Sequence, residues 1–402
     1  MLPLEGLKIV DLSQGQQGPH AAVLLSDMGA DVIKVEPRQG ELGRGVRMSR
    51  RLDPVGGGAS PTQALLLAHD RNKRGIVLDL TKDRGKEIIY KLAENSDVLL
   101  HNFRPGVMER MGLGYAVVSQ YNKGIIYATA SGYGPKGPGA GRRALDIAGQ
   151  ASGGIMMQTG APGGPPVPVG AAVADQAGAM LLAFGIMVAI YVRERTGQGQ
   201  EVDVSLLGAQ MTLQAWELTY HLLTGQLPPR DPRGLGLVGG LWRIFKAQDR
   251  WLALAGVDDE HWAPFCEALG LKNLLRDKRF SSAEGRVEHR DDLVAILDEH
   301  FAKRPLAYWL KALEAADVVV APVNSYADLL QDPQVIENEY ITELKLPDGK
   351  AQKVVGVPVK LSKTPGRPQA PAPEVGQHTN EVLLQLGYSW DDIAKLIEEG
   401  VV

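Results

Sequence analysis

Asp175 is the residue whose type and position most directly suggest chemistry, because it stands at the start of the most apolar predicted helix in the chain. A segment rich in glycine and proline, residues 159–170, precedes it. Aspartate is among the best residues for capping a helix N-terminus, where its charge also favours the helix dipole. The same location is expected to keep the carboxylate ionised, as covalent acyl transfer requires. A structural cap and a carboxylate nucleophile are therefore both open here.

The first predicted strand, loop and helix nearly match a dinucleotide-binding fingerprint. Ser13 occupies the first of the three glycine positions, and Gly15 and Gly18 occupy the others. Glu36 ends the second predicted strand, close to where a ribose-binding acid is expected. Pro19, however, removes an N–H group where a helix N-terminus would cradle a pyrophosphate. A nicotinamide-dependent dehydrogenase is therefore an alternative function, and a tight turn without a ligand is the simpler interpretation.

Cationic side chains recur near the ends of the predicted strands. A polyphosphorylated ligand would need several of them to converge, because one exposed ion pair contributes little on its own. Single surface cations usually face solvent, but recurrence after successive strands favours an anionic ligand. The residues are Arg38, Lys73, Arg74, Arg104, Arg110, Lys136, Arg142 and Arg143.

Composition limits the partners and the location of the protein. The formal net charge of −4 leaves no basic field for nucleic acid or an anionic membrane, so a small-molecule partner is expected. The single cysteine, Cys266, is expected in a core and suits a reducing cytoplasm. The apolar run 177–192 is shorter than the roughly 18–20 residues of a membrane span and predicts a buried core helix.

Other catalytic patterns do not occur in the sequence. The histidines lack metal-ligand spacing, and there is no Gly-x-Ser-x-Gly segment. Neither a metal site nor a serine hydrolase is therefore expected.

The elements that must position these residues form an α/β fold. Short β-rich runs alternate with helical runs in the first third, which predicts βαβ units and a largely parallel sheet with helices on both faces. Ligands of such sheets bind at the carboxyl ends of the strands. The predicted strands are residues 8–12, 31–35, 75–80, 97–100, 125–130 and 201–206, and the predicted helices include 21–28, 86–94 and 209–223.

At 402 residues the chain exceeds the roughly 250–300 residues that one core supports, so two domains are expected. We predict a large Rossmann-like parallel-sheet domain over residues 1–224 and a smaller α+β domain over 225–330. Residues 331–402 are expected to return to the large domain through a proline-rich extended segment at 357–376. A linker with prolines and glycines begins near residue 228, and residues 243–245 and 251–255 predict a hairpin.

The chain resembles the family III CoA-transferases, a group that includes formyl-CoA transferase, the carnitine-metabolism CoA-transferase and α-methylacyl-CoA racemase. The resemblance runs in order along almost the whole chain, and residues 195–205 are its most specific segment. The other matching segments are 6–12, 29–36, 72–74, 102–106 and 110–112. It implies an enzyme that moves coenzyme A from an acyl-CoA to a carboxylic acid, without a tightly bound cofactor. It also implies an interlocked homodimer of two ring-like chains.

The resemblance assigns roles to individual residues. Asp175 falls on the catalytic aspartate, and the implied CoA contacts are Gln16, Gln17, Arg38, Asn72, Lys73, Asn102, Phe103, Arg104, Arg110, Arg142 and Arg143. In relatives a glycine-rich loop from the smaller domain covers the aspartate, and the nearest counterpart here is 234–240, which is not a continuous glycine run. The backbone N–H groups near Gly239 and Gly240, with the Gln16 amide, are candidate donors to the oxyanions of acyl transfer.

The residues at positions 145 and 146 help to distinguish a CoA-transferase from a racemase. The racemase branch needs a histidine as a second acid/base at the position of Leu145, so proton exchange remains only an alternative. The formyl-CoA transferase type has a tyrosine there, and a leucine suggests a more apolar acid. Asp146 matches an acidic position in that type and either orients substrate or is a buried structural residue. A CoA-binding protein without catalysis is a further alternative.

Overall fold

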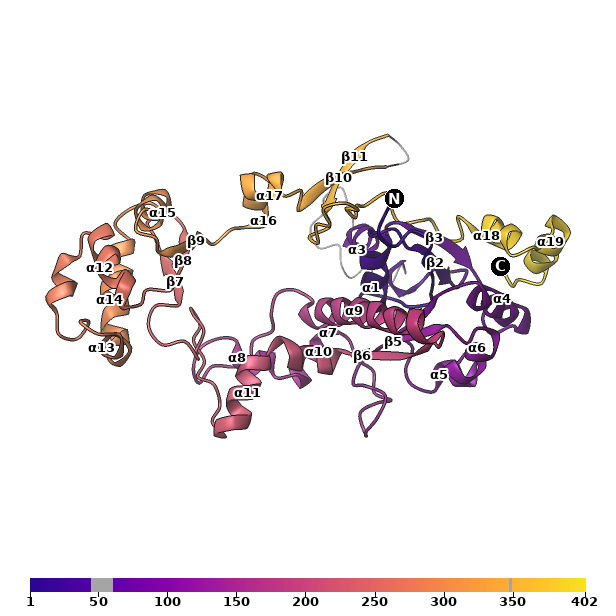
Figure 1. The fold of residues 1–402 in the computed structure, drawn as a ribbon, viewed down its shortest axis with the longest axis horizontal. Coiled ribbons are helices and arrows are strands. Elements are labelled where there is room, and N and C mark those ends of the chain that lie inside the picture. Colours follow the sequence, from indigo (N-terminus) through magenta and orange to yellow (C-terminus); the bar gives the residue numbers. More distant parts are fainter. Residues whose placement is uncertain (45–60, 347–348) are drawn as a thin grey trace. The chain divides into compact units, whose positions relative to one another are not determined.

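The computed structural model describes residues 1–44, 61–346 and 349–402. Its main sheet has six strands: β1 (Lys8–Asp11), β2 (Asp31–Glu36), β3 (Lys73–Val77), β4 (Val98–His101), β5 (Ile126–Ser131) and β6 (Gln200–Ser205). All neighbouring strands pair in parallel, in the order β3-β2-β1-β4-β5-β6 (Figure 1). The chain starts in the centre of the sheet and winds outward both ways, as in nucleotide-binding doubly wound folds. The predicted α/β class is confirmed.

Two compact units make up the described chain: residues 1–154, 169–214 and 333–402 form the first, and 155–168 with 215–332 form the second. The predicted boundaries at 224/225 and 330/331 remain a proposal. The helices of the first unit are α1 (Gln17–Ser26), α3 (Pro61–His69), α4 (Asp83–Glu94), α5 (Val107–Arg110), α6 (Tyr115–Tyr121), α7 (Asp146–Ser152), α9 (Val173–Thr196), α10 (Leu206–Leu213), α17 (Pro333–Glu337), α18 (Thr379–Gln385) and α19 (Trp390–Glu398), with a 3-10 turn at Leu42–Arg44 and a hairpin of β10 (Ile341–Lys345) and β11 (Ala351–Val355).

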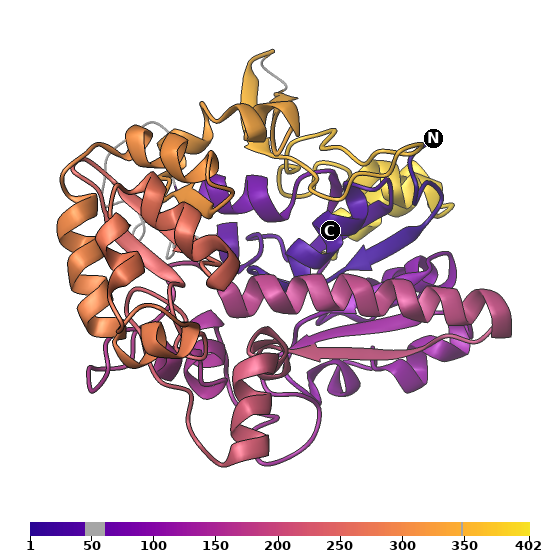
Figure 2. The same cartoon turned by 60° about the vertical axis from the view of Figure 1, so that its left-hand side comes forward.

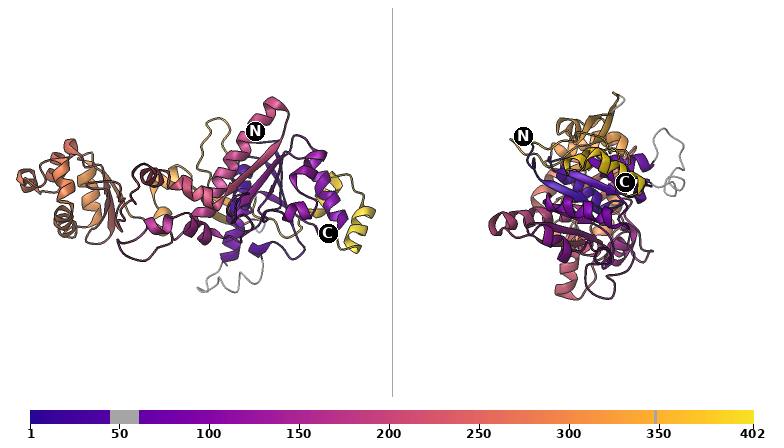
Figure 3. Two further views of the ribbon diagram at one scale, coloured as in Figure 1. Left: turned by 90° about the horizontal axis from the view of Figure 1, so that it is seen from below. Right: turned by 90° about the vertical axis from the view of Figure 1, so that its right-hand side faces the viewer.

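Helices cover both faces of the main sheet because alternate residues of its strands are apolar on both sides. Ile9 packs with residues of α1 and α9 on one face, and Val10 packs with α4, α18 and α19 on the other. The two layers of helices are visible on opposite sides of the sheet when the molecule is seen from below (Figure 3, left). The proline-rich segment after β11 contains neither helix nor strand, as predicted, and leads back to α18 beside β3.

Helix α9 is the long core helix of this unit and lies along the sheet (Figure 2). Its 24 residues are long and apolar enough to cross a membrane, but half of its most apolar stretch is buried inside the protein. Leu182 and Ile186 are fully buried against α1 and the sheet. The helix ends at Gly197, whose φ of 71° provides the left-handed C-terminal turn that glycine adopts without strain. The predicted core helix is thus confirmed.

The second unit is an antiparallel sheet covered by helices. Its strands β7 (Arg243–Lys246) and β8 (Trp251–Ala255) form the predicted hairpin, and β9 (Val319–Pro322) pairs with β8. Cys266 is buried there, and burial raises the pKa of its thiol to about 12, which fits a core role. Its helices are α8 (Ile155–Gln158), α11 (Ala215–Thr224), α12 (Asp259–Ala268), α13 (Ala283–Glu288), α14 (Arg290–Phe301), α15 (Leu306–Glu314) and α16 (Tyr326–Leu329), with a 3-10 turn at Lys272–Arg276.

Two predicted elements differ in extent from the structure. The single helix predicted over 209–223 is two helices, α10 and α11, which are separated at Gln214. Strand β3 begins at Lys73 rather than Gly75, so Lys73 lies inside the sheet and not in a loop. The apolar residues of β3 begin only at Ile76, and for this reason the strand was predicted to start too late in the sequence.

Four charged side chains form a buried cluster beneath the first βα loop. Lys73 Nζ donates to Asp11 Oδ2 and Asp70 Oδ1, both at 2.9 Å, and to Pro19 O at 3.0 Å. Lys34 Nζ donates to Ser13 O at 2.7 Å and lies 3.2 Å from Asp70 Oδ1. Although burial raises the pKa of Asp11, the charges of Lys73 and Lys34 bring it below its usual value. The cluster therefore fixes the loop that follows β1.

Replacing Lys34 with methionine tests this cluster. Asp11 and Asp70 would have to share Lys73, and an uncompensated buried charge lowers the free energy of unfolding by about 3–5 kcal/mol. Urea denaturation at pH 7 measures the loss. The control Lys86→Met removes only the pair with the highly exposed Asp83, which contributes less than about 1 kcal/mol. Equal losses in the two variants would contradict a structural role for the cluster.

Candidate active site

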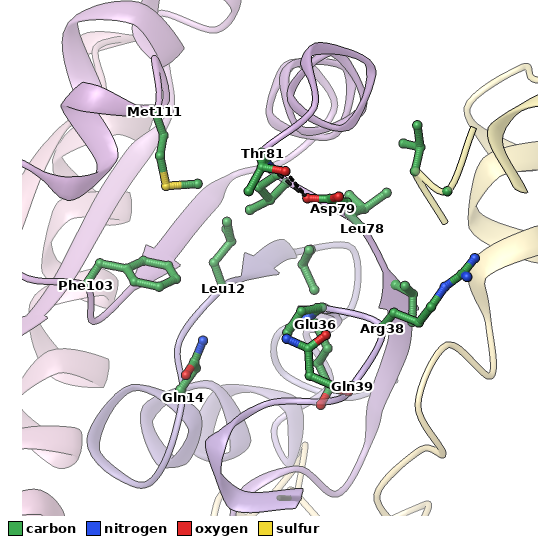
Figure 4. Close-up of a pocket in the computed structure, with 16 residues that line it drawn as sticks. Leu12, Gln14, Glu36, Arg38, Gln39, Leu78, Asp79, Thr81, Phe103 and Met111 are labelled. Carbon is green, nitrogen blue, oxygen red and sulfur yellow. Dashed lines mark hydrogen bonds between the residues drawn. The ribbon is translucent and has the colours of Figure 1, made fainter. Parts of the chain in front are cut away.

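A cavity of about 490 Å³ lies at the carboxyl ends of β1 to β4, where the sequence predicted a ligand (Figure 4). The loops after four successive strands supply its walls, together with two residues that follow α19. The lining residues are Leu12, Gln14, Val35, Glu36, Pro37, Arg38, Gln39, Val77, Leu78, Asp79, Leu80, Thr81, Phe103, Met111, Gly400 and Val401. Two predicted contacts, Arg38 and Phe103, are thus brought together here.

The chemistry of this cavity suits a flat ring with polar substituents. Leu12, Phe103 and Met111 give it apolar walls, and the exposed Arg38 supplies a cation. Asp79 Oδ1 accepts hydrogen bonds from the Thr81 amide at 2.9 Å and hydroxyl at 2.6 Å, and these bonds lower the pKa of the Asp79 carboxyl. The cavity therefore combines stacking surface, a hydrogen-bond acceptor and one guanidinium group.

The loop after β1 is held rigidly beside the cavity. Asn102 Oδ1 accepts from Gln14 N at 2.9 Å, and Asn102 Nδ2 donates to Gln14 O at 2.6 Å. Glu41 Oε2 accepts from Gly15 N at 2.8 Å. Gln16 follows this loop, and within the described residues its side chain makes no hydrogen bond. Its amide is therefore available to a ligand, whereas that of Asn102 is occupied.

Three other predicted CoA contacts are committed to the fold. All three N–H donors of Lys73 are used in the buried cluster. Asn72 Nδ2 donates to Asp27 Oδ1 at 2.7 Å, and Asn72 Oδ1 accepts from the amides of Gln369 and Ala370. Gln17 is buried and its Nε2 donates to Val204 O at 2.9 Å. None of these side chains is free to bind a ligand in this structure.

Four predicted arginines, in contrast, remain uncommitted. They are exposed, and within the parts of the chain that the structure describes their guanidinium groups make no hydrogen bond or ion pair. Two follow β4, one of them in α5, and two precede α7. These residues are Arg104, Arg110, Arg142 and Arg143.

Asp175 is the third residue of α9 and does not cap it, so the capping interpretation is wrong. The residue before the helix is Ala172, which has no capping side chain. Asp146, at the start of α7, provides the cap instead: its Oδ1 accepts from Ala174 N at 2.8 Å and from Asp175 N at 3.2 Å. Two otherwise unpaired N–H groups of the first turn are thereby satisfied. Asp146 is therefore a structural residue in direct contact with the candidate nucleophile.

The expectation that Asp175 stays fully ionised is also corrected. Burial, and secondly the negative charge of Asp146, raise the pKa of the Asp175 carboxyl to about 7. Both effects disfavour the charged form, and the helix end does not offset them because a carboxylate already occupies it. At neutral pH the carboxyl group is poised between its protonated and ionised forms.

Gln150 is a residue of this site that the sequence analysis missed. It is buried on α7, and its Nε2 donates to Asp146 Oδ2 at 2.7 Å and to Ala171 O at 3.2 Å. Its Oε1 accepts from Val169 N at 2.9 Å. The spacing of four residues from Asp146 on a helix was the available signal. Gln150 fixes both the capping carboxylate and the segment that leads into α9.

Gly239 and Gly240 lie in the second unit, in the segment before β7. Gly240 has a φ of 73°, which favours glycine, and a Cβ on Gly239 would approach Val287 Cγ2 to 3.0 Å. That they cover Asp175 stays a prediction from the sequence.

Comparison with known proteins identifies relatives along the whole chain. The model of CoA-transferase family III matches residues 4–379. Succinyl-CoA:glutarate CoA-transferase of Mus musculus is 33% identical over 407 residues, covering 100% of this chain and 91% of that protein. Succinyl-CoA:mesaconate CoA-transferase of Haloarcula hispanica is 31% identical over 397 residues, 96% of each chain. The crystal structure of a CAIB/BAIF family protein from Brucella suis matches with a TM-score of 0.83 at 29% identity, over 96% of this chain and 99% of that one.

The variant Asp146→Asn tests the electrostatic coupling at this site. The amide oxygen can still accept the two N–H groups of α9, whereas the charge beside Asp175 and the hydrogen bond from Gln150 Nε2 are removed. We expect the pKa of Asp175 to fall from about 7 towards its usual 3.8, without reaching it because burial persists. Carbon-13 NMR titration of aspartate carboxyls measures the shift, and Asp175→Asn identifies the resonance. An unchanged pKa would show that burial acts alone.

Proposed function

The chain belongs to the family III CoA-transferases, and on that premise we propose that Asp175 carries the acyl group while coenzyme A moves from an acyl-CoA donor to a carboxylic acid. The observation that supports this role most directly is the position of the Asp175 carboxyl. It lies partly buried on the first turn of α9 and has a pKa near neutrality. A general base or nucleophile is most effective when its pKa lies near the working pH.

The proposed reaction is a sequence of acyl transfers without redox change. An Asp175 carboxylate oxygen attacks the thioester carbonyl, the C–S bond breaks, and the thiolate leaves with the electron pair. The thiolate then attacks the aspartyl carbonyl of the mixed anhydride and releases the donor acid as its carboxylate. An aspartyl-CoA thioester remains. The acceptor carboxylate repeats both steps in reverse, which yields the new acyl-CoA and restores the Asp175 carboxylate.

The properties of Asp175 suit this chemistry. A mixed anhydride preserves the activation of the acyl group, whereas a serine ester would lose it to a more stable intermediate. The ionised form must attack, and its raised pKa makes it a more basic carboxylate than an exposed aspartate. Each tetrahedral stage develops an oxyanion, and a positioned donor stabilises it by about 2.7–4 kcal/mol. The free amide of Gln16 is our candidate within the first unit.

We place the nucleotide end of CoA in the cavity at the carboxyl ends of β1 to β4. Phe103 and Met111 offer apolar surface to the base, and Arg38 offers a guanidinium group to a phosphate. The uncommitted Arg104, Arg110, Arg142 and Arg143 are further candidates to neutralise phosphates. The reaction needs no cofactor besides CoA itself, and a cytoplasmic location fits the single, buried cysteine.

The names of the relatives and one residue, Leu145, limit the choice of candidate donor and acceptor acids. The two relatives described above are named for transfer from succinyl-CoA to glutarate or to mesaconate. Leu145 precedes the capping Asp146 and its side chain is 69% exposed, so an apolar surface adjoins the start of α9. We therefore propose succinyl-CoA as a donor. We propose as acceptors carboxylic acids with an aliphatic group beside the reacting carboxylate, because that group could pack against Leu145.

A homodimer is the assembly that we propose. Met180, Phe184, Val188 and Tyr191 recur at helical spacing on α9, and each is at least 45% exposed in the single chain. A contiguous apolar stripe of this kind is typical of a protein interface. A second copy of the chain is the partner proposed, interlocked as in the family.

Chemical trapping tests the nucleophile. Incubation with succinyl-CoA followed by hydroxylamine is expected to convert Asp175 to a hydroxamate, which peptide mass spectrometry detects. Asp175→Asn should lower transfer to glutarate and mesaconate by roughly 10³-fold or more, because it removes the covalent step. Asp203→Asn is the control, since Asp203 is an exposed residue of β6 whose carboxyl also has a raised pKa and accepts a hydrogen bond from Ser131.

An unmodified Asp175 peptide from an enzyme that turns over would contradict the covalent mechanism. Binding of CoA without any turnover would instead favour a CoA-binding protein, and reduction of a nicotinamide cofactor would favour a dehydrogenase.

The variant Phe184→Glu tests the proposed dimer. A charge in the middle of the exposed stripe should shift the protein from dimer towards monomer in light scattering after size-exclusion chromatography. Tyr308→Glu is the control, because Tyr308 is similarly exposed in the second unit. A monomeric wild-type protein would refute the dimer.

A further inference from the structure

Hydrogen bonds cap helix α19 at both ends. The helix begins with a reciprocal capping box between Ser389 and Asp392. It ends with Gly400 at a φ of 66°, where Gly400 N donates to Ile397 O and Val401 N donates to Leu396 O. These two bonds form a Schellman motif, which reverses the chain immediately after the helix. Residues 399–402, called here the tail, therefore take one direction.

The tail is directed into the cavity. Val401 is 1% exposed and lines the cavity, and it packs in the same core cluster as Leu12 and Leu78 from two strand ends. Asp79 N, in the loop after β3, donates to Val401 O at 2.7 Å. The tail thus continues the cavity wall that the strand ends begin.

The tail also holds Arg38, the one arginine among the described residues that line the cavity. Arg38 Nη2 donates to Val402 O at 2.6 Å. A guanidinium group has five N–H donors, so this bond fixes Arg38 and leaves its other donors for an anion. An exposed arginine would otherwise lose considerable side-chain entropy on binding a ligand.

Ionic contacts at the surface secure the same segment. Arg84 Nη1 donates to both carboxylate oxygens of Glu399 at 2.8 Å, and Lys82 Nζ donates to Glu399 O. Both cations lie in or beside α4, which follows the β3 loop. The tail is therefore tied on one side to Arg38 and on the other to α4.

We propose that residues 399–402 are part of the nucleotide site, with Val401 as a wall for the base and ribose and Val402 O as the group that positions Arg38 for a phosphate. This inference rests on the proposed function, because the ligand is taken to be coenzyme A. Affinity for the nucleotide end of CoA then depends on a segment remote in sequence from every strand loop. Affinity for the pantetheine end does not depend on this segment.

Hydrogen exchange on the wild-type protein tests the proposal without any substitution. Amides in a peptide that covers residues 396–402 are expected to exchange more slowly when CoA is added. Pantetheine, which lacks the nucleotide, should leave them unchanged. Exchange that CoA does not slow would overturn the role of the tail.

Calorimetry with variants gives the second measurement. Val401→Ala should raise the dissociation constant for CoA roughly tenfold, the factor for about 1.4 kcal/mol, and leave pantetheine binding unaffected. Arg38→Gln should remove the preference for CoA over 3′-dephospho-CoA. Ile397→Ala is the control on the same helix, because Ile397 is half exposed and does not line the cavity.

The outcomes separate this proposal from the function on which it rests. Wild-type protein that does not bind CoA would refute the proposed function and the tail with it. Wild-type protein that binds CoA, while Val401→Ala binds it equally well, would refute the tail alone. Equal weakening of CoA and pantetheine by Val401→Ala would also refute it, since a general loss of structure would explain that result.

Discussion

The carboxylate of Asp146 at the start of α9 is the interaction on which the candidate site depends. A helix packed into a protein must satisfy the N–H groups of its first turn, and here no residue next to the helix can do so. Asp146 reaches them from α7, and Gln150 holds it in place. The position of Asp175 therefore depends on a contact between two helices whose contacting residues are 28 and 29 positions apart in the sequence. For the chemistry that we propose, this contact fixes the backbone from which the Asp175 side chain extends.

Burial, and secondly the charge of Asp146, make the ionised Asp175 carboxylate destabilising for the folded protein. A carboxyl whose pKa is raised from 3.8 to about 7 binds its proton more tightly in the folded state than in the unfolded state. Stability therefore falls as the pH rises between these two values, and above about pH 7 the full cost is present. A cap of neutral charge would remove only the smaller part of this cost, because burial is the larger cause of the raised pKa. The presence of a charged Asp146 is consistent with the view that active sites contain groups that destabilise the fold but serve the chemistry.

The sequence was a good guide to the fold and a partial guide to the site. Alternating runs with apolar residues on both faces predicted the parallel sheet and its ligand-binding edge, because these depend on local periodicity. Lys73 and Asn72 were misjudged because a cation or amide next to a strand looks the same whether it faces solvent or a buried acid. Asp11 and Asp27, which bind those side chains, come together with them only through tertiary packing. The tail was missed for the same reason, whereas Gln150 stands four residues after Asp146 on one helix and could have been recognised from that spacing.

The return of the chain after the second unit explains why the two ends of the sequence meet at one site. The edge strand β3 would present unpaired backbone groups if nothing covered it. His378 and Thr379 side chains bind the amides of Gly75 and Val77, and α18 and α19 then follow. Helix α19 packs in the same core cluster as α4, and its Schellman turn leads to the loop after β3, where the cavity lies. Covering the sheet edge and completing the cavity are thus consequences of one path of the chain.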